Sequence, residues 1–214
     1  MPPRAVLWDL DGTLVDSRAY HWRSWQDALA AEGVRVSEAR FRATFGQRND
    51  LILREWLGAG ASPERIARIG AAKEADYRRL VAEGGLAPLP GAAAWLERLG
   101  AAGWRQAVAS SAPRLNVAVV VRALALGRHF GALVAAEDVR HGKPAPEVFL
   151  AAAGRLGVKP RRCVVVEDAA AGVEAARRAG MRSVAVGGLR AGDVVTASLT
   201  DLPPDTFDRL VEER

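Results

Sequence analysis

Residues Val6–Asp16 read VLWDLDGTLVD, and this stretch decides the fold. Its apolar start is typical of a buried strand, and two carboxylates, Asp9 and Asp11, follow one residue apart. Side chains two apart on a strand point to the same face, so we expect both carboxylates side by side at the strand's carboxyl end. Their repulsion calls for a cation, and oxygen ligands suit Mg²⁺. The alternative reading is a strand followed by a common Asp-Gly turn.

Short apolar runs alternate with helical patterns along most of the chain. The runs span residues 5–10, 105–109, 132–136, 163–166, 183–186 and 194–197. This alternation predicts an α/β fold, a Rossmann-like parallel sheet flanked by helices.

One segment interrupts the alternation, because residues 17–85 show helical patterns only. The Gly- and Pro-rich stretch 84–91 that follows is typical of a hinge. We therefore expect an α/β core made of residues 1–16 and 86–214, with residues 17–85 inserted as an all-α cap domain.

The bulk composition limits the partners. The chain has 214 residues, half of them hydrophobic, and a formal net charge of +5. Its basic residues are scattered among acidic ones, which disfavours nucleic acid and suits a small anionic substrate. No apolar run approaches the roughly 20 residues of a membrane span. We expect a cytoplasmic monomer without membrane contact, and the single cysteine, Cys163, as a buried small hydrophobe.

Three further polar signals follow predicted strands, where open α/β sheets place their ligands. They are Ser110 with Ser111, Lys143 before a predicted helix over 146–156, and the pair Glu167-Asp168. A lysine at a helix start opposes the helix dipole, so an anionic group is expected beside it. Glu167 and Asp168 would complete an oxygen cage for Mg²⁺. The structural alternatives are a capping or turn serine, a solvated lysine and an N-cap aspartate.

The order of these motifs resembles the haloacid dehalogenase-like superfamily, in its phosphatase and β-phosphoglucomutase branch with a helical cap. The resemblance implies that Asp9 is the nucleophile and Asp11 the acid-base group. It implies that Ser110 and Lys143 bind the phosphoryl oxygens. A Mg²⁺ cofactor would be held by Asp9, the backbone carbonyl of Asp11, Glu167 and Asp168.

The same resemblance extends to the cap, where substrate specificity is set. His21 matches the mutase pattern, and Lys73 resembles its phosphate-binding cap lysine. The loop Gly46 to Arg48 is similar to the mutase substrate loop, with the arginine one place nearer the glycine. The expected substrate-binding residues are His21, Gly46, Arg48, Lys73, Ser110, Ser111 and Lys143. Local alternatives are a polar helix face for His21 and a solvated helix lysine for Lys73.

The function predicted from these residues is a Mg²⁺-dependent phosphatase that acts on a small phosphorylated metabolite, such as a sugar phosphate, through an aspartyl-phosphate. A β-phosphoglucomutase-like isomerase is the first alternative. A 2-haloacid dehalogenase needs no metal and lacks the second aspartate of the motif, so Asp11 argues against it. A non-catalytic phosphate-binding regulator would require a missing catalytic group, and none is missing.

Overall fold

A computed structural model describes residues 2–58 and 60–212. Within this range the strands form one parallel sheet in the order β3-β2-β1-β4-β5-β6. Their bounds are β1 (Ala5–Trp8), β2 (Arg105–Ala109), β3 (Ala132–Val134), β4 (Cys163–Glu167), β5 (Arg182–Ala185) and β6 (Val194–Val195). The predicted Rossmann-like α/β fold is confirmed, with strand ends shifted by a residue or two.

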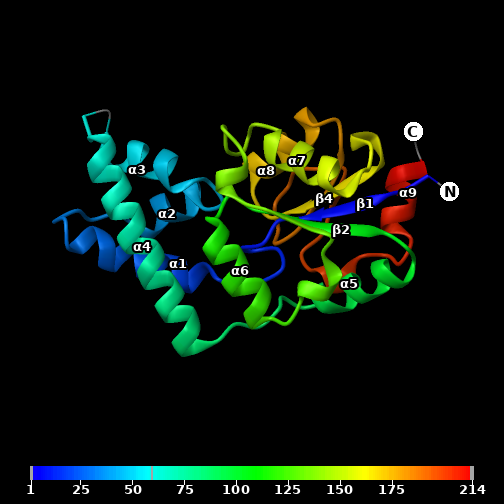
Figure 1. Cartoon of the computed structure of the whole chain (residues 1–214), viewed down its shortest axis with the longest axis horizontal. Coiled ribbons are helices and arrows are strands. Elements are labelled where there is room, and N and C mark those ends of the chain that lie inside the picture. The colour runs from blue at the N-terminus through cyan, green and yellow to red at the C-terminus, as the bar shows by residue number, and fades with distance from the viewer. Residues whose placement is uncertain (1, 59, 213–214) are drawn as a thin grey trace.

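Helices cover both faces of the sheet (Figure 1). Successive residues of a strand point to opposite faces, so Val6 and Trp8 pack into one apolar cluster and Ala5 and Leu7 into another. One face is covered by α7 (Glu147–Leu156) and α8 (Ala170–Arg178). The other is covered by α5 (Ala92–Ala101), α6 (Arg114–Ala123) and α9 (Thr206–Glu212). The central strands are therefore buried on both sides, which explains their continuous apolar runs.

Four successive helices lie to one side of the sheet and form a helical cap (Figure 1). They have an apolar cluster of their own, which includes Trp25, Phe41 and Trp56. At the start of the last one, Ser62 accepts a hydrogen bond from the Arg65 amide and Pro63 is the first helical residue. The four are α1 (Arg18–Ala30), α2 (Glu38–Thr44), α3 (Asn49–Leu57) and α4 (Pro63–Gly84).

The chain leaves the core and returns to it along two adjacent segments. Val15 pairs with Pro88 in an antiparallel bridge, and the Leu89 amide donates to the Leu14 carbonyl at 2.9 Å. These paired crossings support the proposed boundaries of a cap at 17–85 and a core at 1–16 and 86–214. Residues 1, 59 and 213–214 of those ranges lie outside the described part of the chain.

Two smaller expectations concern the core and the membrane. Cys163 begins β4 and is buried, as predicted. Among residues 2–58 and 60–212, no helix combines the length and the apolar character required to cross a bilayer.

Candidate active site

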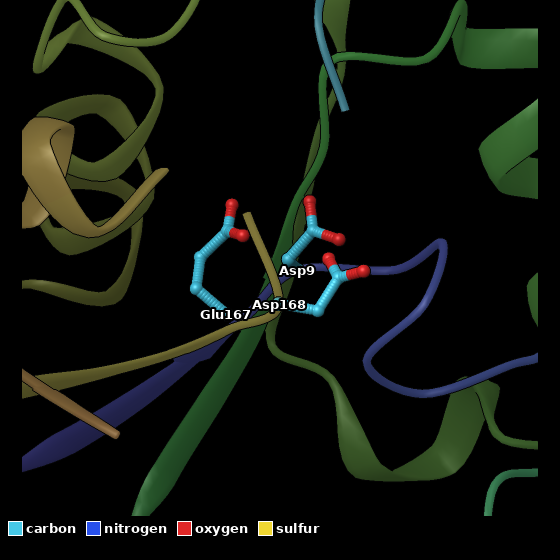
Figure 2. A group of neighbouring side chains, drawn as sticks. All are labelled: Asp9, Glu167 and Asp168. Atoms are coloured by element: carbon cyan, nitrogen blue, oxygen red, sulfur yellow. The ribbon is translucent and has the colours of Figure 1, made fainter. Parts of the chain in front are cut away.

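Three carboxyl groups meet at the carboxyl ends of β1 and β4 (Figure 2). Asp9 follows β1, Glu167 ends β4 and Asp168 comes next. One oxygen of each lies within 4.8 Å of one oxygen of the others. β1 ends at Trp8, so Asp9 and Asp11 both lie beyond the strand, and both line the same cavity. Asp9 lies with Glu167 and Asp168 in one group of carboxylates, whereas Asp11 contacts His21 of the cap.

Lys143 is the counter-ion of this cluster. Its Nζ lies 2.5 Å from Asp9 Oδ1 and 2.5 Å from Glu167 Oε1, and the residue is 1% exposed. It lies in the loop just before α7, which begins at Glu147, as expected for a lysine that precedes a helix. Burial lowers the pKa of Lys143, but Asp9 and Glu167 outweigh it and hold the pKa above its ordinary value. The expected anionic neighbour is thus a pair of carboxylates, and the lysine is not solvated.

The cluster still carries excess negative charge. Burial raises the pKa of Asp9 well above its ordinary value, and Lys143 only partly offsets this. Burial and then Glu167 raise the pKa of Asp168 to about 7. Arg18 of the cap lies 3.5 Å from Asp168 and gives weak compensation. Three carboxyl groups around one ammonium therefore favour an additional cation.

Asp168 presents an oxygen suited to such a cation. Its Oδ1 is buried and accepts no hydrogen bond from any residue in the described ranges. Gly12 packs against it so closely that a Cβ there would lie 2.1 Å from Asp168 Oδ2. Glu167 is more fully engaged, because Oε1 contacts Lys143 and Oε2 accepts from the Ala169 amide at 2.9 Å. Carboxylate oxygens of Asp9 and Asp168, with Glu167 beside them, could thus hold a hard divalent ion.

Asp11 is linked through a histidine to a buried lysine. His21 Nε2 lies 3.2 Å from Asp11 Oδ1, and Lys73 Nζ lies 2.8 Å from His21 Nδ1. Because an ammonium only donates, Nδ1 must accept, and the Nε2 hydrogen is then directed to Asp11. The Ser17 hydroxyl also donates to Asp11. The Tyr77 ring stacks on His21 with its centroid 4.1 Å away.

Lys73 and His21 are both buried, so the alternatives of a solvated lysine and of a histidine on a polar helix face are wrong. Lys73 is 1% exposed and His21 8% exposed, so neither lies on a solvated helix face. The reason is tertiary, because α1 and α4 pack against each other along these faces. Lys73 also contacts Glu74 Oε1 at 2.8 Å, which supplies the charge that a buried ammonium needs.

The protonation states follow from these contacts. Burial raises the pKa of Asp11, but His21, Ser17 and Lys73 outweigh it and leave the pKa below its ordinary value. Burial, together with the charge of Lys73, lowers the pKa of His21. At neutral pH, Asp11 is therefore ionised and His21 is neutral.

One cavity of about 40 Å³ lies between the sheet edge and the cap. Ser110, 2% exposed, accepts from the Ala112 amide at 3.0 Å, which fits the turn-serine alternative. Ser111 Oγ is buried and has no hydrogen-bond partner among the described residues. Seven of the predicted site residues line this cavity: Asp9, Asp11, His21, Gly46, Lys73, Ser110 and Ser111. Lys143 reaches it through Asp9.

Arg48 is not brought into this cavity. Its Nε lies 3.0 Å from Asp50 Oδ1, and its NH1 donates to the carbonyl oxygens of Val139 and Arg140 at 3.3 and 3.4 Å. It lines an outer groove that also touches Glu74. Arg48 therefore connects the cap to the core.

Several lining residues were missed by the sequence reasoning. Glu74 and Asn49 reach the cavity, and Trp25, Phe41 and Phe45 line it. The adjacency of Glu74 to Lys73 was the available signal for the first. The aromatic residues sit at helical spacing, which reads as ordinary cap core.

Comparisons with known proteins identify the family of this chain. The family described as haloacid dehalogenase-like hydrolase matches residues 3–180. CbbY of Rhodobacter capsulatus is 34% identical over 193 residues, covering 86% of this chain and 85% of CbbY. Fructose-1-phosphate phosphatase YqaB of Escherichia coli is 32% identical over 187 residues, covering 85% and 95%.

A solved structure shows the same architecture. β-Phosphoglucomutase from Clostridium difficile superposes with a TM-score of 0.90 at 26% identity, covering 99% of this chain and 98% of the mutase. The predicted resemblance is confirmed across the core and the cap. The chain belongs to the haloacid dehalogenase-like hydrolases, a family of enzymes.

Proposed function

We propose that this enzyme is a Mg²⁺-dependent phosphatase that hydrolyses a phosphate monoester of a small metabolite through an aspartyl-phosphate on Asp9. One observation carries the proposal: Asp9 and the Asp11–His21 pair face the same cavity, so a nucleophile and an acid-base group meet there. The name of the relative YqaB, a sugar phosphate phosphatase, supports the substrate class.

The first step uses Asp9 and Asp11. An Asp9 carboxylate oxygen attacks phosphorus, the new P–O bond forms and the ester P–O bond to the alcohol breaks. Asp11 gives a proton to the leaving oxygen. Since Asp11 is ionised in the ligand-free site, it must first gain that proton, and an arriving phosphate dianion raises its pKa in the required direction.

The second step reverses the role of Asp11. Its carboxylate takes a proton from water, the water oxygen attacks phosphorus, and the acyl phosphate bond breaks to restore Asp9 and release phosphate. The His21 N–H keeps the Asp11 carboxylate oriented. Ser111, whose hydroxyl has no partner among the described residues, is placed to donate to a phosphoryl oxygen.

The residues fit a Mg²⁺ ion at the carboxylate cluster. Asp9 and Asp168 would hold it, together with the Asp11 carbonyl. The buried Oδ1 of Asp168 has no hydrogen-bond partner among the described residues and is available as a metal ligand. Glu167 would hold Lys143 and the Ala169 amide beside it. When bound, the ion supplies positive charge that shields the phosphoryl oxygens and stabilises the transition state.

A mutase is the second candidate, since β-phosphoglucomutase shares the fold closely. That reaction requires two phosphates on one intermediate, and the cap must hold the second. Arg48 is committed to Asp50 and to core carbonyls, and Lys73 is paired with Glu74. These contacts favour hydrolysis.

The cavity is small in this arrangement. About 40 Å³ has room for roughly three waters, so a sugar phosphate enters only when the cap moves. The adjacent crossings at Val15 and Pro88 are the hinge on which such movement would occur.

The test is phosphate release from a panel of phosphorylated metabolites with Mg²⁺ and with excess chelator. We expect release with Mg²⁺, none with chelator, and none from Asp9→Asn, while Asp27→Asn on the exposed face of α1 retains it. Mg²⁺ should also raise the Tm of the wild type but not of Asp168→Asn. The mutase alternative is tested with β-glucose 1-phosphate and a trace of the 1,6-bisphosphate, where glucose 6-phosphate without comparable free phosphate would contradict the proposal.

A further inference from the structure

We propose that Glu74 sets the substrate class of this cavity: it admits a phosphate monoester whose far end is a neutral, hydroxyl-bearing group and rejects a second phosphate. The inference rests on the proposed function and names the class of substrate, a polyol or sugar monophosphate.

Glu74 carries a buried negative charge on the cavity wall. The residue is 6% exposed, and its Oε1 lies 2.8 Å from Lys73 Nζ and 2.5 Å from Asn49 Nδ2. Its Oε2 accepts from Asn116 of α6, so the carboxylate is fixed from both the cap and the core. In this arrangement, hydrogen bonds to both oxygens hold the anion on the cavity wall.

The charge of Lys73 is consequently not free for a second phosphate. Lys73 is shared between Glu74 and His21. Among the described residues that line the cavity, Lys73 is the only cation, because Lys143 lies behind Asp9 and Arg48 faces the outer groove.

Arg78 is the other nearby cation, and it is also engaged. Its NH1 donates to Asn116 Oδ1 at 2.9 Å, and the residue lines the outer groove, not the cavity. Among the described residues, the cavity lining therefore holds no lysine or arginine besides Lys73, and Lys73 is paired with the Glu74 carboxylate.

The remaining chemistry of the wall suits a polyol or a sugar. A carboxylate has about four acceptor positions, and Glu74 uses three of them. A hydroxyl can donate to the fourth, whereas a phosphate dianion has no proton to give and is repelled. Trp25, Phe41 and Phe45 offer apolar faces for the C–H groups of such a substrate. Small-molecule pockets are commonly lined by aromatic side chains with a few polar groups that orient the ligand.

The experiment compares kcat/KM for matched pairs: fructose 1-phosphate with fructose 1,6-bisphosphate, and glucose 6-phosphate with glucose 1,6-bisphosphate, all with Mg²⁺. The variants are Glu74→Gln, which removes the negative charge but keeps the size and shape of the side chain, and Glu74→Asp, which keeps the negative charge. Glu83→Gln is the control, because Glu83 lies on the same helix with a 60% exposed side chain. Circular dichroism and Tm report whether each variant is folded.

We expect the wild type, Glu74→Asp and Glu83→Gln to favour the monophosphates, and Glu74→Gln to reduce that preference about ten- to a hundredfold, mainly through the KM of the bisphosphates. A wild type that uses the bisphosphates equally well or better overturns the inference and leaves the phosphatase function intact. An unchanged preference in folded Glu74→Gln overturns it as well. If phosphate is released neither from these four compounds nor from any other phosphate monoester, the proposed function itself is overturned. The wild-type comparison decides the inference if Glu74→Gln does not fold.

Discussion

Lys73 Nζ lies 2.8 Å from His21 Nδ1, so an ammonium on α4 is joined through one imidazole to the carboxylate of Asp11 in the core. Lys73 also contacts Glu74, which extends the chain of polar contacts to Asn116 of α6. Asp11, the cap and the wall of the cavity are thus parts of one buried network.

The Lys73–Glu74 pair should behave as a coupled unit in stability. Lys73→Met leaves the Glu74 charge buried without its cation, and we expect a loss of about 3–5 kcal/mol in the free energy of unfolding. Lys73→Met/Glu74→Gln should recover most of that loss because no charge is left unpaired. Urea unfolding of the single and double variants measures the coupling. Losses that simply add in the double variant would refute the pairing.

His21 should affect turnover more than substrate binding. His21→Asn removes the imidazole that stacks on Tyr77 and the N–H that is directed to Asp11. We expect kcat to fall up to about a hundredfold, below the full effect of losing the acid-base group. Steady-state kinetics check this. A change confined to KM would instead make His21 a binding residue.

The sheet could be predicted from the sequence because buried parallel strands are continuous apolar runs. The predicted strand ends were less accurate: β1 stops at Trp8, before both aspartates, and Asp11 contacts Ser17 and His21. Asp9, Glu167 and Asp168 could be placed together because each lies at or just beyond the carboxyl end of a strand in the same sheet.

The cap contacts could not be predicted in the same way. Lys73 in the sequence Lys73-Glu74-Ala75-Asp76 reads as a solvated helix residue, and only the packing of α4 on α1 buries it. Besides the nearby Asp50, Arg48 bonds to backbone carbonyls more than 90 positions away along the chain, which no local pattern encodes. Asn116 has no sequence signal at all.

Gly12 should be required for the metal site. Gly12→Ala places a methyl group onto Asp168 at a φ of +90°, so we expect Mg²⁺ affinity to fall more than about tenfold and phosphate release to fall with it. Gly58→Ala is the matched control, since its φ is +83° and, apart from its chain neighbours, no described residue lies within 4 Å of the added carbon. It should show only backbone strain, about 1–2 kcal/mol. Mg²⁺ titration of both variants compares them, and equal affinities would contradict a tight Gly12–Asp168 contact.

Asp138 should give the core a pH-dependent contribution to stability. Burial raises its pKa, but Arg155, the Ala135 amide and Arg114 outweigh it and lower the pKa to about 2. A lowered folded-state pKa stabilises above the unfolded value and is lost as pH falls through the folded value. We expect Asp138→Asn to cost roughly 1 kcal/mol at pH 7 after solvent screening, and almost nothing near pH 2. Unfolding at both pH values measures it, and an equal cost at both would rule out the ionic contribution.

The covalent role of Asp9 is tested most directly by quenching wild-type enzyme in acid during turnover and locating phosphorylation by peptide mass spectrometry. The account predicts one phosphoryl group on the peptide that contains Asp9, labile to hydroxylamine and absent from Asp9→Asn. Steady phosphate release with no phosphorylated Asp9, or continued release by Asp9→Asn, would contradict it.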